Sequence, residues 1–217
     1  MTRIIGGAWR GRRLVAPAGE ATRPTADRVR QALFDRLMHA DWAGRAAIEG
    51  ASVLDVFAGT GAFGLEALSR GAAEAAFVER DRAGLAALRA NIATCGAECQ
   101  CRVVAGDALR PPPGQACSVV FLDPPYGEGL VLRAVTGLMA AGWIAAGALI
   151  LAEIGRGEAL EVDALASWEH GAARLVAWRV ASPHPGPLPE GEGARKEPSP
   201  GGRGSKKRAL SLRERVG

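Results

Sequence analysis

The residues best placed to do chemistry are four consecutive ones, Asp123-Pro124-Pro125-Tyr126. They follow the apolar run at residues 118–122, which has the composition of a buried strand. Proline fixes its own backbone torsion, so the two prolines make a rigid turn at the end of that strand. Doubly wound α/β proteins bind their ligands at the carboxyl ends of the strands. We therefore predict that this turn lies in an active site.

The residue types of the turn suit methyl transfer to the exocyclic amine of a nucleic-acid base. Such an amine is a poor nucleophile because its lone pair is delocalised into the ring. The Asp123 carboxylate and the Pro124 carbonyl can accept its two N–H bonds and so direct the lone pair toward a sulfonium methyl group. Pro125 helps to fix that carbonyl, and Tyr126 can stack on the base. We name all four residues as catalytic candidates.

A glycine-rich segment supplies the candidate cofactor site. The strand predicted over residues 52–57 is followed by Gly59-x-Gly61-x-x-Gly64, where a cofactor can approach the backbone without meeting a Cβ. Glu79, at the end of the next strand, can accept hydrogen bonds from both ribose hydroxyls of a nucleoside. Asp107 is placed to reach an adenine amine, although an exposed loop position explains it as well. The predicted cofactor is S-adenosylmethionine, held by Asp55, Phe57, Gly59, Thr60, Gly61, Glu79 and Asp107.

A nicotinamide dinucleotide is the competing cofactor, because the glycine spacing and Glu79 fit it equally. A full dinucleotide site needs a second mononucleotide-binding half after the fourth strand. Only about 50 plausibly folded residues follow Tyr126. A dehydrogenase mechanism also gives no role to the Pro-Pro-Tyr turn. We therefore favour S-adenosylmethionine over a nicotinamide dinucleotide as the cofactor.

Cysteines and histidines give no sign of metal chemistry. The four cysteines form a Cys-x3-Cys-x-Cys cluster at residues 95–101 and one distant member, Cys117. This spacing matches neither zinc-ligand pairs nor a secreted disulfide framework, and we predict reduced thiols. The three histidines are scattered. A sulfonium donor is already activated, so we assign no metal.

The elements that must position these residues alternate between strands and helices. This alternation predicts a parallel sheet with helices on both faces. Together with the candidate donor site and the DPPY turn, it leads us to expect an α/β, Rossmann-like fold of the class I S-adenosylmethionine-dependent methyltransferase type. Its sheet is mostly parallel and doubly wound, with an antiparallel edge strand. Strands are predicted at residues 52–57, 75–79, 101–105, 118–122 and 149–153, helices at 64–70, 82–94 and 130–141, and a closing strand at 174–180 that pairs near Trp168.

Charge is distributed unevenly along the 217 residues. Residues 1–45 hold nine arginines and four acidic residues, and residues 181–217 hold eight basic and four acidic residues, whereas the middle holds ten basic and fifteen acidic. A polyanionic partner explains the basic ends, and a solvated charged surface does so equally. We predict a basic N-terminal RNA-binding arm and helix at 1–45, a methyltransferase catalytic domain at 46–180, and a disordered Pro/Gly-rich basic tail at 181–217.

Arginines of the first part are the candidate RNA contacts. Those around Gly11 form a basic turn suited to phosphates, and an amphipathic helix follows with Val29 and Leu33 on one side. On that helix, Arg28 and Arg30 can point toward RNA or pair with Asp27 and Glu66. The candidates are Arg10, Arg12, Arg13, Arg23, Arg28 and Arg30.

The apolar runs are short. None approaches the roughly 20 residues that a membrane span needs, and the first residues lack the apolar core of a signal peptide. We expect a cytoplasmic protein, a monomer without a membrane partner.

Four longer segments occur in a fixed order: RIIGGAWRGRRL at residues 3–14, RPTADRVRQALF at 23–34, DVFAGTGAFGLEALSRGA at 55–72 and DPPY at 123–126. In these segments the chain resembles the bacterial small-subunit ribosomal RNA guanine-N2 methyltransferase family, and the likeness extends from Arg3 to about residue 180. Two positions depart from the family pattern, because Gln31 stands where Glu is usual and Asp35 where Asn is usual. Both departures leave the DPPY turn intact.

The resemblance implies methyl transfer to the N2 amine of one guanine in small-subunit (16S) ribosomal RNA, within a partly assembled ribosomal particle. The residues alone leave two other functions open. A DPPY turn also serves DNA adenine-N6 and other amino-methyltransferases, although such DNA enzymes usually carry a target-recognition region for which this chain has no room. A non-catalytic, RNA-binding ribosome-assembly factor with the same fold is the other alternative, and the intact catalytic turn argues against it.

Overall fold

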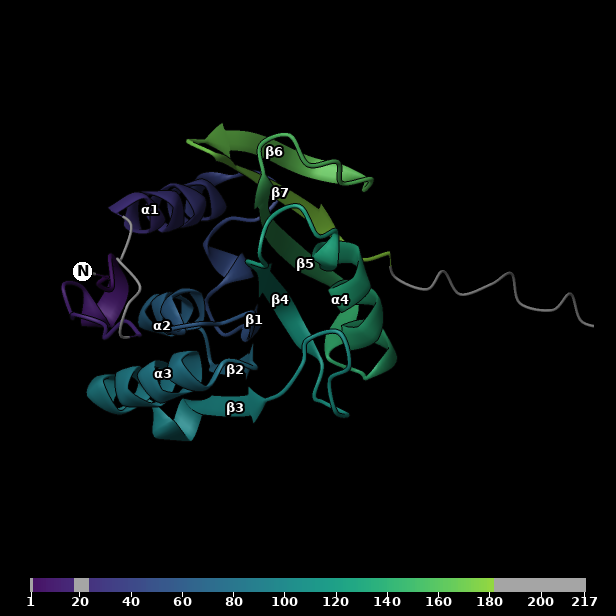
Figure 1. Cartoon of the computed structure of the whole chain (residues 1–217). Coiled ribbons are helices and arrows are strands. Elements are labelled where there is room, and N and C mark those ends of the chain that lie inside the picture. The colour runs from purple at the N-terminus through teal and green to yellow at the C-terminus, as the bar shows by residue number, and fades with distance from the viewer. Residues whose placement is uncertain (1, 18–23, 182–217) are drawn as a thin grey trace, which may run out of the picture. The chain divides into compact units, whose positions relative to one another are not determined.

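The computed structural model describes residues 2–17 and 24–181, and residues 1–183 form one compact unit. Its centre is a seven-stranded sheet with the strand order β3-β2-β1-β4-β5-β7-β6 (Figure 1). Except for Ala181, the tail predicted to be disordered lies outside the described residues. The strands are β1 (Ser52–Val56), β2 (Glu74–Glu79), β3 (Cys101–Ala105), β4 (Cys117–Leu122), β5 (Ile144–Gly155), β6 (Ala164–His170) and β7 (Ala173–Arg179), the helices are α1 (Pro24–His39), α2 (Ala62–Ser69), α3 (Arg82–Cys95) and α4 (Leu130–Ala140), and short 3-10 turns lie at η1 (Gly7–Trp9), η2 (Arg45–Ala47) and η3 (Glu98–Gln100).

The sheet confirms the predicted fold class. Strands β1 to β5 pair in parallel, with β1 between β2 and β4. Strand β7 runs antiparallel to β5, and the edge strand β6 pairs antiparallel with β7. Trp168 lies opposite Leu175 in that last pair, as the sequence predicted.

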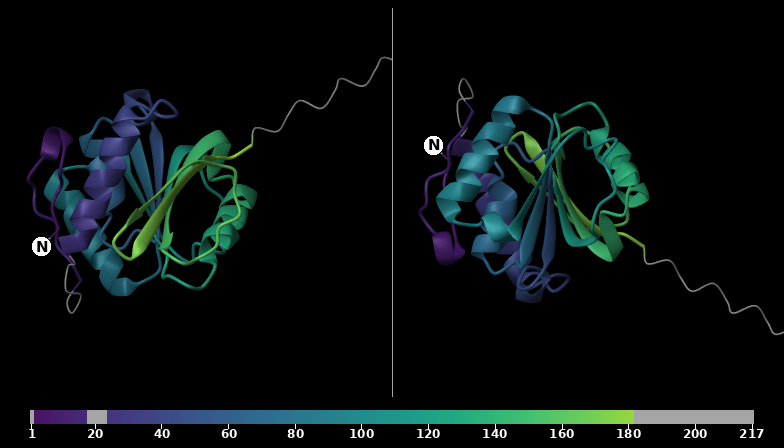
Figure 2. Two further views of the ribbon diagram at one scale, coloured as in Figure 1. Left: turned by 90° about the horizontal axis from the view of Figure 1, so that it is seen from above. Right: turned by 90° about the horizontal axis from the view of Figure 1, so that it is seen from below.

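Helices cover both faces of the sheet, as Figure 2 shows. Alternate residues of a strand point to opposite faces. Val53 accordingly packs in one core with Leu65 of α2, and Leu54 packs in a second core with Leu138 of α4. The first core also holds apolar residues of α1 and α3, so three helices cover one face and α4 covers the other.

Residues 2–17 lie over α2 and α3 on the side away from the sheet (Figure 1). They double back at Gly11, which has a φ of 83°, and a bridge joins Arg3 to Arg13. At Gly7 a Cβ would lie 1.7 Å from the backbone oxygen of Ser69, so only glycine allows this approach to α2. Residues 2–17 of the predicted arm are therefore packed against α2 and α3.

Candidate active site

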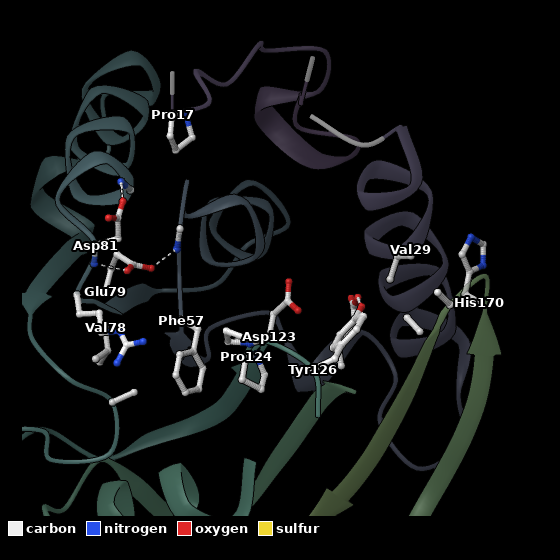
Figure 3. A pocket seen from close by; sticks show the side chains of 18 of the residues that line it. Pro17, Val29, Phe57, Val78, Glu79, Asp81, Asp123, Pro124, Tyr126 and His170 are labelled. Carbon is white, nitrogen blue, oxygen red and sulfur yellow. Dashed lines mark hydrogen bonds between the residues drawn. The ribbon is translucent and has the colours of Figure 1, made fainter. Parts of the chain in front are cut away.

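A cavity of about 1010 Å³ opens at the carboxyl ends of the parallel strands (Figure 3). Its volume is at the upper end of the range for small-molecule sites, about 300–1000 Å³. Phe57 follows β1, Glu79 ends β2, Asp123 follows β4, and Glu153 lies near the end of β5, and all four line it. The topology therefore gathers at one place side chains that are far apart in the sequence.

The cavity brings together most, but not all, of the predicted site residues. Asp55, Thr60, Gly61 and Asp107 are not among the described residues that line it. The predicted residues that do line it are Phe57, Gly59, Glu79, Asp123, Pro124, Pro125 and Tyr126.

Glu79 lines the cavity at the end of β2. Its carboxylate accepts hydrogen bonds from the backbone N–H groups of Gly59 (2.7 Å) and Asp81 (2.6 Å). Asp81 in turn caps α3 by accepting from the N–H of Gly84 at 2.7 Å. A carboxylate offers about four lone-pair sites, so Glu79 is fixed in place and can still accept from two hydroxyls.

Gly59 and Phe57 carry the unusual backbone of the loop after β1. Gly59 has a φ of 51°, and its α-carbon faces open space, with no atom within 4 Å of the place a Cβ would take. Phe57 has a φ of 61° although it is not glycine. Such a conformation costs on the order of 1 kcal/mol and tends to occur at ligand sites. The strained loop turns the Phe57 ring into the cavity (Figure 3).

The other two glycines of the motif serve packing. A Cβ on Gly61 would lie 2.3 Å from Cδ1 of Leu88, and one on Gly64 would lie 2.4 Å from Cε1 of Phe77. Both positions must therefore be glycine for α2 to approach β2 and α3. This close approach gives a packing reason for glycine at position 61, which is not among the described residues that line the cavity.

Asp55 is buried beneath the loop and accepts a hydrogen bond from the N–H of Gly64 at 2.9 Å. Burial raises the pKa of its carboxyl from 3.8 to about 7, and the charge of Glu79 adds to this rise. The Gly64 hydrogen bond and the Arg30 charge oppose it. Asp55 thus fixes the start of α2 below the cofactor loop.

Thr60 and Asp107 each make a hydrogen bond that stabilises the chain around the cavity. The carbonyl of Thr60 accepts from Nδ2 of Asn91 at 2.9 Å. The Asp107 carboxylate accepts from the N–H of Leu109 at 3.0 Å and so stabilises the turn after β3. Its neighbours Gly106 and Ala108 line the cavity, so Asp107 shapes the wall.

The turn at residues 123–126 follows β4 and lies beside the end of β5. Leu122 pairs with Ala152, and the residues that follow them in the chain, Asp123 and Glu153, are close enough for their charges to interact. The Tyr126 hydroxyl donates a hydrogen bond to the Glu153 carboxylate.

Carboxyl groups crowd this end of the cavity. Solvent reaches Asp123 through the opening, but the surrounding protein limits its hydration, which raises the pKa of Asp123 well above its usual value; the charges of Glu153 and Asp55 add to that rise. Burial raises the pKa of Glu153, whereas the Tyr126 hydrogen bond and the charge of His170 lower it. A positive ligand group placed among these carboxyls would be stabilised by them.

Sequence reasoning missed several residues of the cavity. Glu153 carried a usable signal, because it is the last residue of a predicted strand, as Glu79 is. His170 is the last residue of β6, and it lines the cavity because the chain returns along the sheet in β6 and β7. Pro17 and Val29 line the cavity from the N-terminal part of the chain.

The predicted RNA contacts fall into two groups. Arg10, Arg12 and Arg13 are exposed on the N-terminal segment, and Arg28 is exposed on α1. One nitrogen of Arg12 donates to the carbonyl of Thr94 at 2.7 Å, which places this side chain at the end of α3. Arg23 lies outside the described residues.

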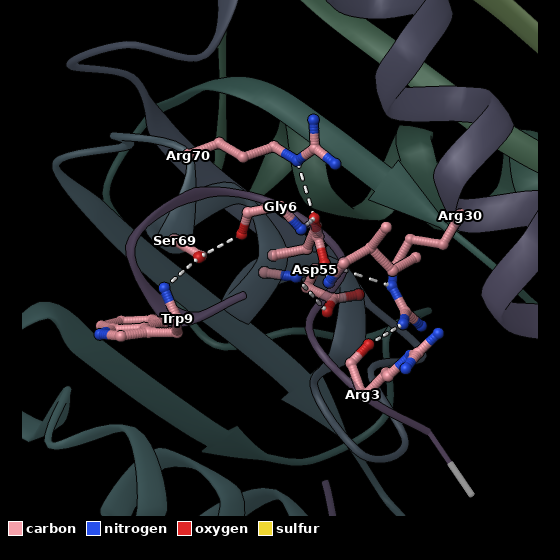
Figure 4. Close-up of polar contacts among 10 residues, drawn as sticks. Arg3, Gly6, Trp9, Arg30, Asp55, Ser69 and Arg70 are labelled. Carbon is pink, nitrogen blue, oxygen red and sulfur yellow. Dashed lines mark hydrogen bonds and ion pairs between the residues drawn. The ribbon is translucent and has the colours of Figure 1, made fainter. Parts of the chain in front are cut away.

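Arg30 must be removed from the candidate contacts. Only 2% of its surface is exposed, since it lies inside the fold beside Glu66, at 3.7 Å, and donates to the carbonyl of Arg3 at 2.6 Å (Figure 4). A buried guanidinium cannot meet phosphates, so of the two roles expected for Arg30 the pairing with Glu66 is correct.

Among residues 2–17 and 24–181, no group of three His, Cys, Asp or Glu side chains is arranged to hold a metal ion. No helix in that part of the chain has both the length and the apolar character for a membrane span.

The strand order, the reversed β7 and a ligand-sized cavity at the carboxyl ends of the strands define a Rossmann-like, class I methyltransferase fold. Within this class, the chain belongs to the family described as Conserved hypothetical protein 95, whose model matches residues 2–175.

Named relatives and a solved structure agree with this assignment. The chain is 44% identical over 153 residues to ribosomal RNA small subunit methyltransferase D of Escherichia coli K12, which covers 70% of this chain and 73% of the relative. It is 40% identical over 157 residues to the protein of the same name from Haemophilus influenzae, covering 70% and 77%. The solved structure of the Escherichia coli protein yhhF superposes with a TM-score of 0.71 at 38% identity, covering 83% of this chain and 98% of that one.

Proposed function

We propose that this protein transfers a methyl group from S-adenosylmethionine to the exocyclic N2 amine of one guanine in small-subunit ribosomal RNA. The observation that carries the proposal is that Asp123 and Tyr126 share one cavity with Glu79. The names of the relatives support ribosomal RNA as the substrate. We further propose that it acts as a monomer, in the cytoplasm, on a partly assembled small-subunit particle.

The residues of the cavity fit this donor. Glu79 keeps lone pairs for two ribose hydroxyls, and Gly59 leaves room beside its α-carbon. A cation bound between Asp123 and Glu153 would reduce the electrostatic repulsion between their two carboxylates. When bound, S-adenosylmethionine supplies a methyl group that its positive sulfur has already activated.

The acceptor amine is oriented by the catalytic turn. Asp123 and the carbonyl of Pro124 accept its two N–H bonds, which frees the lone pair from conjugation with the ring. Tyr126 stacks on the base. Because the pKa of Asp123 is raised, its carboxyl can hold the proton that the amine releases after methylation.

The exposed arginines of the N-terminal segment are the proposed RNA contacts. Arg10, Arg12 and Arg13 lie on the segment that packs on α2 and α3, and Pro17 at the end of that segment lines the cavity. Guanidinium groups bind phosphates without regard to base sequence. They would hold the RNA while the cavity selects the base.

Mass spectrometry of ribosomal RNA from cells with and without the gene tests the function. Nucleoside digests should lose N2-methylguanosine when the protein is absent, and ribonuclease fragments should locate the loss at one position of the small-subunit RNA. The wild-type gene should restore the modification. An unchanged N2-methylguanosine content would refute the proposal.

Purified protein separates RNA from DNA as the substrate. Tritiated methyl transfer to unmodified small-subunit particles should exceed transfer to duplex DNA of the same mass by at least about 100-fold. Equal or greater transfer to DNA would instead support an amino-methyltransferase of DNA.

A further inference from the structure

Glu153 is an acidic side chain of the cavity outside the catalytic turn. It lies next to Asp123 across the β4–β5 pair, and it accepts a hydrogen bond from the Tyr126 hydroxyl. A carboxylate has about four lone-pair sites, and Tyr126 takes one of them. Glu153 can therefore accept further hydrogen bonds from a base that lies beside Tyr126.

The base amines differ in what stands next to them on the ring. In guanine the amine-bearing carbon is flanked by N1–H, a donor, and by N3, an acceptor. In adenine and cytosine the ring nitrogen next to the amine-bearing carbon carries a lone pair and no hydrogen. A carboxylate beside the amine therefore complements guanine and opposes the lone pair of the other two bases.

We infer that Glu153 reads the N1–H of guanine and is the residue that makes the cavity select guanine over adenine and cytosine. The inference rests on the proposed function, because it assigns a role within the same transfer. Asp123 and Pro124 would take the amine hydrogens, which every base amine has, so they orient without discriminating. Glu153 would supply the discrimination.

Two neighbours of Glu153 favour the ionised form that this role needs, against the effect of burial. Burial raises the pKa of Glu153, but the Tyr126 hydroxyl and the charge of His170 both stabilise the carboxylate. An N1–H donor would stabilise it further. A cavity built to hydrogen-bond a ring N–H rejects an analogue without that hydrogen by as much as about 10⁴-fold, because the carboxylate then faces a ring lone pair in place of a donor.

The inference is tested with 2-aminopurine, which carries the same N2 amine as guanine but has no hydrogen on N1. Small-subunit particles are reconstituted with RNA that carries either guanosine or 2-aminopurine riboside at the target position. We expect wild-type protein to prefer guanosine by at least about 100-fold in kcat/KM. The variant Glu153→Gln can turn its amide N–H toward a bare N1, so it should shrink this preference at least about tenfold.

The control variant Tyr126→Phe removes the hydroxyl that bonds to Glu153 and keeps the ring. If Glu153 reads the base, this variant lowers kcat/KM for both substrates and leaves their ratio near that of the wild type. If Glu153 serves only to place Tyr126, the two variants change the ratio alike, and the inference is wrong.

Two other results have distinct meanings. If the wild-type protein methylates 2-aminopurine with the same kcat/KM as guanosine, the inference is wrong, whether or not a variant folds. The proposed function is unaffected by that result. No transfer to the guanosine particle, with donor binding retained, is the failure of the proposed function itself.

Discussion

Asp55 is a buried acidic side chain, and its contribution to the stability of the folded protein depends on pH. Only 2% of its surface is exposed, and its partner is the N–H of Gly64. Because burial raises its pKa to about 7, the folded protein keeps this proton at pH values where the unfolded chain, with a pKa of 3.8, has lost it. The stability that this proton contributes is complete below pH 4 and lost as the pH rises through 7.

The variant Asp55→Asn should remove this pH dependence, because asparagine can still accept from Gly64 but does not titrate. One pKa unit corresponds to about 1.4 kcal/mol, so between pH 5 and 7 the wild type should lose up to about 1.4 kcal/mol per pH unit relative to the variant. Denaturant unfolding at pH 5, 6, 7 and 8 measures the difference. Free energies of unfolding that run parallel over this range would show that Asp55 has an ordinary pKa.

At the scale of elements, the N-terminal segment is tied to the cofactor loop through α3. Asn91, fully buried on α3, accepts from the N–H of Val15 at 2.7 Å and donates to the carbonyls of Val15 at 3.0 Å and Thr60 at 2.9 Å. Ser69 of α2 makes a second tie, because it accepts from Trp9 and donates to Gly6 (Figure 4). The segment that carries the exposed arginines is therefore held to the same helices as the cofactor loop.

The variant Asn91→Ala should loosen this connection. It leaves backbone groups of Val15 and Thr60 without their partner, which costs about 2–3 kcal/mol of stability. Hydrogen exchange at residues 12–17 should rise, and donor affinity should fall, because Thr60 belongs to the loop beside Gly59. Arg89→Ala, an exposed change on the same helix, is the control and should shift stability by less than about 0.5 kcal/mol. Unchanged exchange in the Asn91 variant would mean that α3 does not hold the segment.

Much of the fold could be predicted because its elements have strong local patterns. The strand at Cys101–Ala105 and the start of α3 at Arg82 were predicted at their observed positions. Strand β5 was predicted at residues 149–153 but runs from Ile144 to Gly155. Alanine and glycine at residues 145–148 have weak strand preference, and pairing with β4 and β7 decides the length instead.

The site was predictable to the extent that it follows strand ends. Glu79 and the turn at residues 123–126 were found in this way, and Glu153 could have been. The burial of Arg30 could not, since it depends on Glu66 and on the chain near Arg3 meeting at one point. The glycine motif marked Gly61 as a special position, but the packing that requires glycine there, the close approach of Leu88, could not be predicted from the sequence.

At the scale of the whole molecule, the sheet gathers acidic groups in and below the cavity proposed to hold the cationic donor. The pKa values of Asp55, Asp123 and Glu153 are all raised. A positive sulfur beside Asp123 and Glu153, which line the cavity, would lower their pKa values. Binding near pH 6.5 should therefore release protons, and the affinity for S-adenosylmethionine should rise with pH.

Calorimetry at pH 6.5 in two buffers of different ionisation enthalpy measures this release. S-adenosylhomocysteine is the matched ligand, because it has the same nucleoside and a neutral sulfur, and it should release fewer protons. Equal proton release by the two ligands would show that the carboxyls do not respond to the sulfonium charge.

The central claim is that the turn after β4 orients the amine for transfer and does not serve mainly to hold the donor. Single-turnover methyl transfer to unmodified small-subunit particles, measured beside the dissociation constant for S-adenosylmethionine, tests it in Asp123→Ala. We predict that the transfer rate falls by about 100-fold or more, because an interaction made in the transition state is lost, while the dissociation constant changes by less than about threefold. A transfer rate within tenfold of the wild type, or a loss of donor binding as large as the loss of transfer, would contradict the account.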